Sequence, residues 1–167
     1  MTDSADQSLL DIARARLIVH QAGLVRACLE ALNDGQIWWR ANEDSNSIGN
    51  LVLHLTGSTR FFIGHGVGNS GYARDRDREF NEPGPLAKEE LLAHFEVAMA
   101  EADRVLQAID PATLNEANDR TGKTKTNGEL ILNQALHFTS HAGQIMYATK
   151  LIQAGLLDEV WINTPMQ

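Results

Sequence analysis

Two histidines, His137 and His141, stand four residues apart in a long apolar stretch of the chain. Residues at that spacing project from the same face of an α-helix, so the two imidazoles are expected to lie side by side. A third histidine, His54, lies in a separate apolar stretch. A buried imidazole needs a hydrogen-bond partner or a metal ion, and three of them on two helices indicate a three-histidine site for a divalent transition metal.

Three neutral imidazoles leave positions on an ion open for water or substrate, which is typical of catalytic metal sites. Zinc, nickel and iron all accept imidazole nitrogen, so these ligands do not choose the metal. Asn50, Asn133 and Gln144 each lie about one helical turn from a candidate ligand. They are candidates for pocket or supporting positions around the ion. The open alternative is that they simply hydrogen-bond to histidines that are ordinary core residues.

Other chemistries are disfavoured by the residues beside the histidines. A zinc protease of the His-Glu-x-x-His type needs Glu after the first histidine, where this chain has Phe138. A di-iron bundle needs Glu three residues before its histidines, and no Glu stands at those positions. The single cysteine, Cys28, lies on an apolar stripe, which favours a core position over a nucleophile. His20 and His94 are expected at packing or solvated positions, and His65, eleven residues from His54 and roughly 16 Å further along the helix, cannot complete the same metal site.

Four amphipathic segments are predicted to be the helices that position these residues. They cover residues 4–32, 48–68, 86–109 and 127–155. With 43% hydrophobic and only 6% aromatic residues, they indicate an all-α fold in one domain, residues 1–167. A left-handed residue within Asn33-Asp34-Gly35 is expected to close the first helix. One residue of Ser45-Asn46-Ser47 is expected to cap the second, and Thr126 with Glu129 to form a capping box on the fourth.

The apolar periodicity also predicts which residues face inward. The stripe of the first helix is expected to contain Leu10, Ala13, Leu17, Leu24, Cys28 and Ala31. That of the fourth is expected to contain Leu130, Gln134, His137, His141, Gln144, Ala148 and Leu151 or Ile152. If the second and fourth helices are antiparallel neighbours, His54 lies level with the histidine pair, whereas parallel neighbours would leave them about 10 Å apart along the axis.

Two segments outside the helices are expected to serve other purposes. Residues 69–85 are rich in Gly, Asn and alternating charges, and a loop of that length is expected to form the rim of a pocket. The tail, residues 156–167, is expected to fold back on the bundle or to enter a dimer contact.

The composition limits the partners and the location. Lysine and arginine total 14 against 22 acidic residues, and the net charge of −8 argues against a nucleic-acid partner. No apolar run approaches the roughly 20 residues of a membrane span. One cysteine and no basic-then-apolar leader favour a cytoplasmic protein.

These residues give the chain a resemblance to the DinB/YfiT-like superfamily, in particular its DUF1572 branch. The matching stretches are residues 38–40 leading into 46–55, then 74–80, and 137–145. The resemblance implies a four-helix bundle with long crossover connections, usually assembled as a homodimer. It also implies a metal held by one histidine of the second helix and two of the fourth, here His54, His137 and His141. Characterised relatives include transferases and isomerases that use low-molecular-weight thiols such as bacillithiol or mycothiol.

The sequence therefore predicts a metal-dependent enzyme acting on a small-molecule substrate, with the ion activating water or a thiol for hydrolysis or transfer. No side chain is identified as a catalytic acid or base. The alternative is a non-catalytic binding or interaction protein, dimeric and stabilised by its metal. A third interpretation is a dimeric scaffold in which Trp161 of the tail carries the partner interface.

Overall fold

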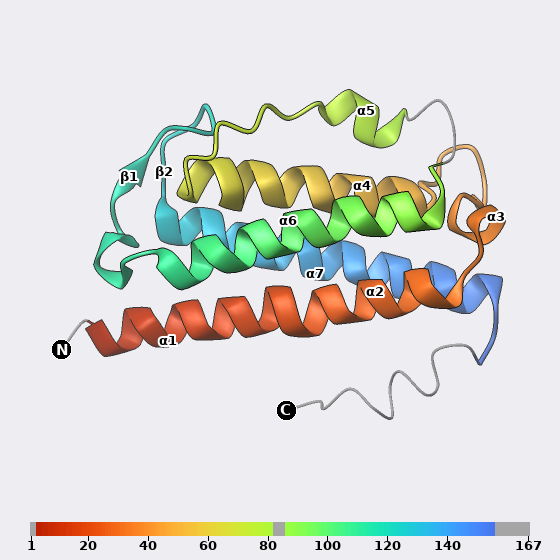
Figure 1. The fold of residues 1–167 in the computed structure, drawn as a ribbon, viewed down its shortest axis with the longest axis horizontal. Helices are drawn as coiled ribbons and strands as arrows, with labels where there is room; N and C mark the ends of the chain where they lie inside the picture. Colours follow the sequence, from red (N-terminus) through yellow and green to blue (C-terminus); the bar gives the residue numbers. More distant parts are fainter. Residues whose placement is uncertain (1–2, 82–85, 156–167) are drawn as a thin grey trace.

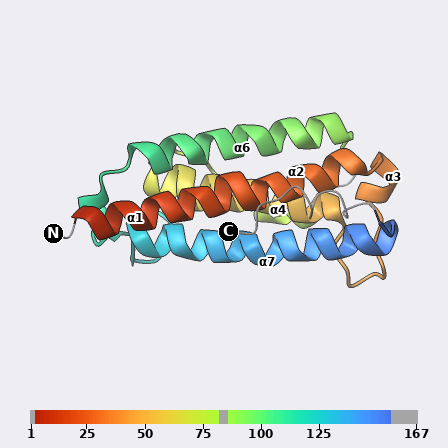
Figure 2. The same cartoon turned by 90° about the horizontal axis from the view of Figure 1, so that it is seen from below.

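The computed structural model describes residues 3–81 and 86–155, in which four long helical rods pack side by side (Figures 1 and 2). The first rod consists of α1 (Asp3–Arg14), the π-helical segment η1 (Ala15–Gln21) and α2 (Ala22–Ala31). The second consists of α4 (Ile48–Thr59) and a second π-helical segment, η2 (Arg60–Val67). The third and fourth are α6 (Lys88–Ala108) and α7 (Asn127–Ile152).

The connections contain short elements. These are α3 (Asp34–Ile37), α5 (Arg76–Phe80), the 3₁₀ turn η3 (Pro111–Thr113), and a two-stranded antiparallel hairpin of β1 (Ala117–Asn118) and β2 (Lys125–Thr126). The segment predicted as a long loop therefore holds a helical turn, α5, which Asp75 caps by accepting a hydrogen bond from the backbone of Arg78.

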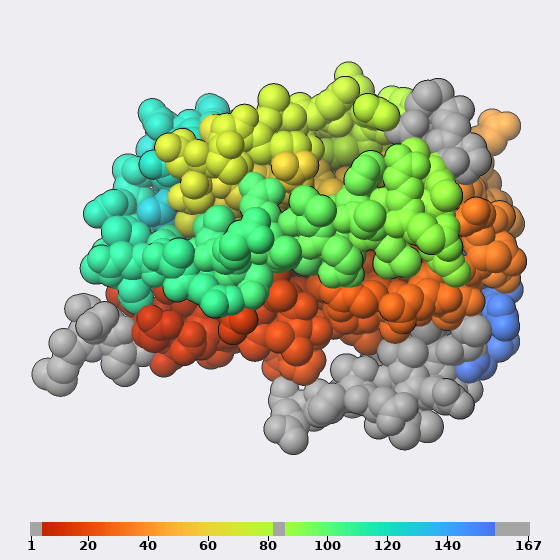
Figure 3. Space-filling view, viewed as in Figure 1, coloured from red at the N-terminus to blue at the C-terminus, as the bar shows by residue number. Residues whose placement is uncertain are grey.

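The rods form an all-α four-helix bundle with one long return. The first rod and α7 run in one direction, while α4 and α6 run in the other, so that α4 and α7 are antiparallel (Figure 1). Since α4 and α6 are parallel, the chain after η2 travels back along the outside of α4, and α5 lies on this path (Figure 1). In the space-filling view, α6 and the first rod cover the near side, and the segment with α5 lies above them (Figure 3).

The core is formed by aliphatic and aromatic side chains from all four rods. Phe95 of α6 and Phe138 of α7 are fully buried, with ring centres 6.2 Å apart. Truncating such a buried ring to Ala typically costs about 3–5 kcal/mol of stability. Cys28 is buried in α2, as predicted. Among the described residues, no helix is both long and apolar enough to cross a membrane.

The predicted helix caps are confirmed at two of three places. Ser47 caps α4 by accepting from the backbone of Asn50, and Thr126 and Glu129 form the capping box of α7. The left-handed stop after the first rod is wrong, because Asn33 is extended, with φ −91° and ψ 170°. Asn33 is instead the first residue of a new capping box, paired with Gln36, so α3 begins where the first rod ends.

The inward stripe of the first rod is correct before η1 and shifted after it. Leu10, Ala13 and Leu17 are buried as predicted, but Ala31 is exposed and Leu24 is only partly covered. The residues buried in their place are Val25, Leu29 and Leu32, with Cys28 retained. A π-helical turn inserts about one extra residue, so the 3.6-residue pattern moves on by one position beyond it. The tail that was expected to pack on the bundle, including Trp161, lies outside the described residues.

Candidate metal centre

The side chains of His54, His137 and His141 meet between α4 and α7. One ring nitrogen from each lies within 4.8 Å of the other two, and the Nε2 atoms of His54 and His137 are 2.9 Å apart. The rings stand nearly perpendicular to one another, at 81° to 88°. Two nitrogens on one tetrahedral ion lie about 3.3 Å apart. The three donors therefore fit a single ion with small side-chain movements.

The antiparallel arrangement of α4 and α7 brings these residues to one level. The sequence predicted this alignment only if the two helices were antiparallel neighbours. The inward face predicted for α7 is correct at Leu130 and Gln134, which are buried, but beyond them it is wrong by one residue. Phe138, Ala142 and Ile145 fill the core, while His137 and His141 are half-buried beside them and Gln144 is exposed. The histidines thus lie at the boundary between the core and a cavity.

Hydrogen bonds to Nδ1 orient two of the three rings. His54 Nδ1 donates to Glu79 Oε2 at 2.8 Å, and His141 Nδ1 donates to Gln144 Oε1 at 2.7 Å. A neutral imidazole that donates from Nδ1 keeps its lone pair on Nε2, the nitrogen available to a metal. Carboxylate and amide partners of this kind fix the ring and raise its basicity in known metal sites.

Glu79 belongs to α5 and is only 6% exposed. Both of its carboxylate oxygens accept from Arg74, at 2.6 and 2.7 Å, so the guanidinium and the His54 ring hold it from two sides. Burial raises the pKa of Glu79, but the hydrogen bonds and charges of Arg74 and His54 outweigh it and hold the pKa below its usual value. A charged carboxylate therefore lies against His54 at neutral pH.

The position of Glu79 depends on two residues of α4. Gly57 lies directly beneath the carboxylate, and a Cβ there would overlap it. Asn50 is fully buried, and its Nδ2 donates to the backbone oxygens of Glu79 and Phe80 at 3.2 and 3.3 Å. Asn50 therefore fastens α5 to α4. It supports the histidine cluster from a distance, through Glu79.

The protonation of the other two histidines is set mainly by burial. Loss of solvent, together with the nearby rings of His141 and His54, lowers the pKa of His137 to about 4. Burial also lowers the pKa of His141, against the opposing effect of its hydrogen bond to Gln144. Both rings are therefore neutral at pH 7, which is the protonation state that a metal ion requires.

A cavity of about 730 Å³ opens beside the cluster. Its floor includes His54, His137, His141 and Gln134, and its wall includes Asn133. Phe61, Phe62, Phe80 and Leu130 supply the main apolar surface, and Arg74, Arg76, Lys123 and Lys125 supply the charged one. Gln134 is 1% exposed and donates to the hydroxyls of Ser58 and Thr59, while its Oε1 has no hydrogen-bond partner in the described ranges. The predicted rim segment, residues 69–85, does border this cavity through α5.

Two participants escaped sequence analysis, Glu79 and Arg74. They lie in a run of alternating charges at residues 74–79 that reads as a solvated surface. Two signals pointed to this run: Glu79 falls at its apolar end, next to Phe80, and residues 74–80 are one of the stretches that carry the resemblance. The contact with His54 spans 25 residues and depends on where α5 docks, which no local pattern specifies.

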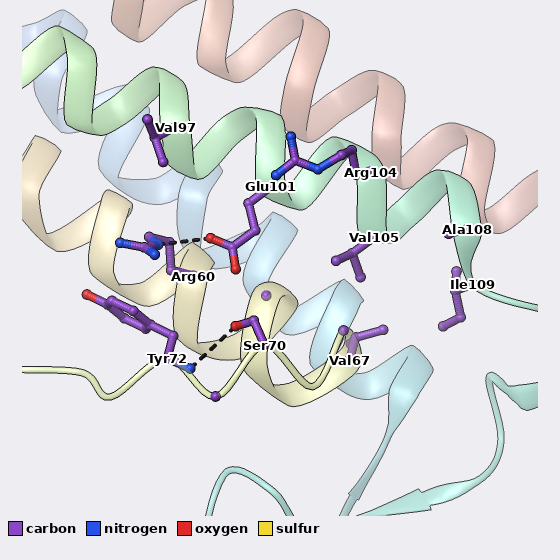
Figure 4. A pocket seen from close by; sticks show the side chains of 13 residues that line it. Arg60, Val67, Ser70, Tyr72, Val97, Glu101, Arg104, Val105, Ala108 and Ile109 are labelled. Carbon is purple, nitrogen blue, oxygen red and sulfur yellow. Dashed lines mark hydrogen bonds and ion pairs between the residues drawn. The ribbon is translucent and has the colours of Figure 1, made fainter.

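A second cavity, of about 760 Å³, lies on the other side of the α4 rod, facing α6 (Figure 4). Arg60 of η2 pairs there with Glu101 of α6 at 2.9 Å, and its guanidinium lies 4.2 Å from the ring centre of Tyr72. Figure 4 shows Arg60 between Glu101 and Tyr72, with Val105 farther along α6 and Ile109 just beyond its end. Burial is the main cause that raises the pKa of Tyr72. None of the described residues that line this second cavity is a histidine.

Comparison with known proteins finds one family and one fold. Residues 4–164 match the profile of the family described as "Protein of unknown function (DUF1572)". The structure is similar to the crystal structure of a DinB-like protein from Bacillus cereus ATCC 10987, with a TM-score of 0.62 and 15% sequence identity over 87% of this chain and 89% of that one. At this identity the likeness establishes the fold alone. A search of the curated proteins finds no match.

Proposed function

The chain belongs to the DUF1572 family and has the DinB-like fold, and on that premise we propose that it is a metal-dependent enzyme. A divalent transition ion, zinc, nickel or iron, would be held by His54, His137 and His141. The observation that carries this proposal is the meeting of three imidazoles beside an open cavity. Three protein ligands and an accessible cavity are the arrangement of catalytic rather than closed sites.

When bound, such an ion would activate a water or a thiol, or polarise a substrate, for hydrolysis or transfer. The chain's own residues prepare the site: Glu79 and Gln144 hold the rings of His54 and His141 with Nε2 directed to the centre. Phe61, Phe62 and Phe80 restrict water on one side of the cavity. The cavity lining among the described residues contains no Asp or Glu, so the proposal assigns no side chain as general base.

A thiol used in this reaction would have to enter as a cosubstrate. The single cysteine, Cys28, is fully buried in α2, and burial raises the pKa of its thiol. It does not line the histidine cavity. We therefore propose that a low-molecular-weight thiol, of the kind used by characterised members of the superfamily that the chain resembles, serves as the cosubstrate.

The proposal is tested by metal content. The full chain, purified and dialysed against metal-free buffer, is expected to retain about one zinc, nickel or iron ion per chain by elemental analysis. A His137→Ala, His141→Ala double variant should lose that ion, while the matched control His94→Ala, on exposed His94 of α6, should keep it. A parent without stoichiometric metal, or a double variant that binds metal equally well, would contradict the site.

Activity is the second stage of the same test. The metal-loaded chain is expected to consume a thiol, or to hydrolyse an ester or amide probe, faster than the double variant. In the alternative function the metal has only a structural role and links α4 to α7. The hydrogen bond between His54 and Glu79 favours this alternative, because it connects the same histidine to α5 as well. In that case chelation should lower Tm by many degrees and no turnover should depend on the ion, whereas an open catalytic site should lose activity with a modest shift in Tm.

A homodimer is part of the proposal. The neighbouring α1, η1 and α7 expose several large apolar side chains: Leu9, Ile12, Val19, Leu132, Leu136, Tyr147 and Leu151. An exposed apolar surface of this kind is a common feature of subunit interfaces. Light scattering coupled to gel filtration should give twice the chain mass of 18.4 kDa, and Ile12→Lys with Leu136→Lys should restore the monomer. A monomeric parent would contradict this part of the proposal.

A further inference from the structure

The basic residues around the histidine cavity point to the class of its substrate. We propose that the cavity takes a small anionic molecule, a carboxylate or a phosphate with an aromatic or other apolar part. The anionic group would lie at the cavity mouth among Arg76, Lys123 and Lys125, and the reacting part would lie at the three histidines. The inference rests on the proposed function only for the part of the substrate that reacts at the histidines, because binding of the anionic group by the basic residues requires no metal.

Among the residues that the structure describes, the charges that line the cavity are all of one sign. Arg74, Arg76, Lys123 and Lys125 line it, and no acidic residue of the described ranges does. This is unexpected in a chain with 22 acidic and 14 basic residues. Two separate segments supply these charges, α5 with the residues before it and the β1–β2 hairpin. The convergence of both segments on one opening raises the local concentration of anions there.

Three of the four cations have no ion-pair partner among the described residues. Arg74 is occupied by Glu79, with which it forms two hydrogen bonds. Arg76, Lys123 and Lys125 take part in none of the ion pairs found among the described residues. Elsewhere Arg14 pairs with Asp103 and Arg26 pairs with Glu96. Arg76 and Lys123 are exposed and Lys125 is partly exposed, so these three cations are available to a ligand at the solvent-facing side of the cavity, here called its mouth.

An aromatic wall connects the mouth to the histidines. The ring centre of Phe80 lies 4.7 Å from that of His54 and 5.2 Å from the guanidinium carbon of Arg76. The His54 ring and the Arg76 guanidinium are therefore within about 10 Å of each other, since both contact the same ring. Phe61 and Phe62 pack together on the same cavity, with ring centres 5.1 Å apart. A molecule with an anionic end and an apolar ring matches this length and surface.

Calorimetric titration with four probes of similar size tests the inference: phenyl phosphate, phenylacetate, neutral phenylacetamide and cationic phenethylamine. The full chain is used both metal-loaded and chelator-treated. We expect both anions to bind about tenfold more tightly than the amide in either form, more weakly at high salt, and the amine to bind least. The ratio between phenyl phosphate and phenylacetate then identifies which anion the mouth prefers.

Charge-reversal variants locate the effect. Lys123→Glu, Lys125→Glu and Arg76→Glu should each weaken binding of the anions about threefold to tenfold and leave phenylacetamide within twofold. The matched control is Arg104→Glu, which makes the same charge change at the second cavity and should leave every probe within twofold. Circular dichroism and Tm verify that each variant is folded.

The outcomes separate this inference from the proposed function. Equal binding of anions and amide by the metal-loaded chain overturns the inference, while the metal site stands. A preference for anions that requires the ion and ignores the three mouth variants also overturns it, because the ion alone then binds the anion. A preference that persists without metal and disappears in the mouth variants supports the inference, even where the chain retains no metal and the proposed function fails.

Discussion

The rod formed by α4 and η2 has a cavity on each of two sides, and the two cavities are nearly equal in volume, about 730 and 760 Å³. On the α6 side, one of the two lining cations, Arg60, is satisfied by Glu101 and by the face of Tyr72, and the other is Arg104. On the α7 side, three imidazoles face one another. There, within the described part of the chain, three cations have no acidic partner and Gln134 has an unpaired oxygen. Volume does not distinguish the two. What differs is how many polar groups remain for a ligand to satisfy.

A close structural parallel makes this comparison testable. On each side, a glutamate accepts hydrogen bonds from an arginine and lies over a glycine of the same rod: Glu79 with Arg74 over Gly57, and Glu101 with Arg60 over Gly64. Of the two, Glu79 alone has a further hydrogen-bond partner in the described part of the chain, the His54 ring. The two glutamates therefore serve as a matched pair, in which the contact with a histidine is the main difference.

The largest effect is expected from removing the histidine that links the two helices. His54→Ala should weaken metal binding on the order of 1,000-fold or more, because the ion loses one of three protein ligands. Arg60→Ala, one and a half turns further along the same rod, should leave metal affinity within a few-fold. Competition with a chelator of known affinity measures both. Similar losses in the two variants would indicate that metal binding depends on the integrity of the rod and not on the cluster.

The second-largest effect on metal affinity is expected from substituting Glu79, in contrast to Glu101. Glu79→Gln keeps the size of the side chain but removes the charge that His54 Nδ1 contacts, and should weaken metal binding about 10- to 100-fold. Glu101→Gln should change Tm by a similar amount and leave metal affinity unchanged. The separation of affinity from stability is the informative result. If both variants lower metal affinity equally, Glu79 has no specific role toward the ion.

The paired glycines test the same parallel through packing. Gly57→Ala and Gly64→Ala each place a Cβ where a carboxylate now lies, so each should cost about 1–3 kcal/mol of stability. Only Gly57→Ala is expected to weaken metal binding as well, because it displaces Glu79 from His54. Urea unfolding gives the stabilities and chelator competition the affinities. An unaltered metal affinity in Gly57→Ala would show that Glu79 can move without consequence for the site.

Much of this arrangement can be predicted from the sequence, and the features that cannot be predicted have identifiable physical causes. The four rods follow from apolar periodicity, and the histidine cluster follows from the spacing of His137 and His141 with one further residue, His54. The periodicity loses its register after η1, because a π-helical turn adds a residue that the 3.6-residue pattern does not contain. On α7 the exposed Leu136 and Tyr147 carry apolar character on the outer side, so the inward face is ambiguous by one position.

The contact between Glu79 and His54 could not be predicted from local sequence patterns, for a different reason. Glu79 reaches His54 only because Asn50 binds the backbone of α5. That contact joins segments about 29 residues apart and is chosen by tertiary packing. A charged run has no periodicity that distinguishes a buried carboxylate from a solvated one. The same applies to the mouth, where Arg76 and Lys123 are brought to one opening by the path of two connections.

The pH dependence of stability tests whether burial of His137, on the α7 side of the rod, lowers the pKa of its ring. The pKa of His137 falls from 6.5 in the unfolded chain to about 4 in the fold. Between these values the unfolded state binds more protons, so the metal-free fold is most stable above pH 6.5 and loses stability as the pH falls toward 4. Urea unfolding at several pH values should show a smaller loss over this window in His137→Leu. Parallel profiles for the variant and the parent would contradict the assignment to His137.

The smallest effect is expected at Gln144, which holds the His141 ring from an exposed position. Its Oε1 accepts from His141 Nδ1 at 2.7 Å, but water can replace it there because the residue is solvent-accessible. Gln144→Ala should therefore weaken metal binding only about twofold to fivefold, far less than Glu79→Gln, which leaves a buried ring without its anion. Chelator competition at constant pH resolves the difference. Equal losses at the two positions would mean that the buried charge adds nothing beyond orientation, and that the two Nδ1 partners act only by fixing the rings.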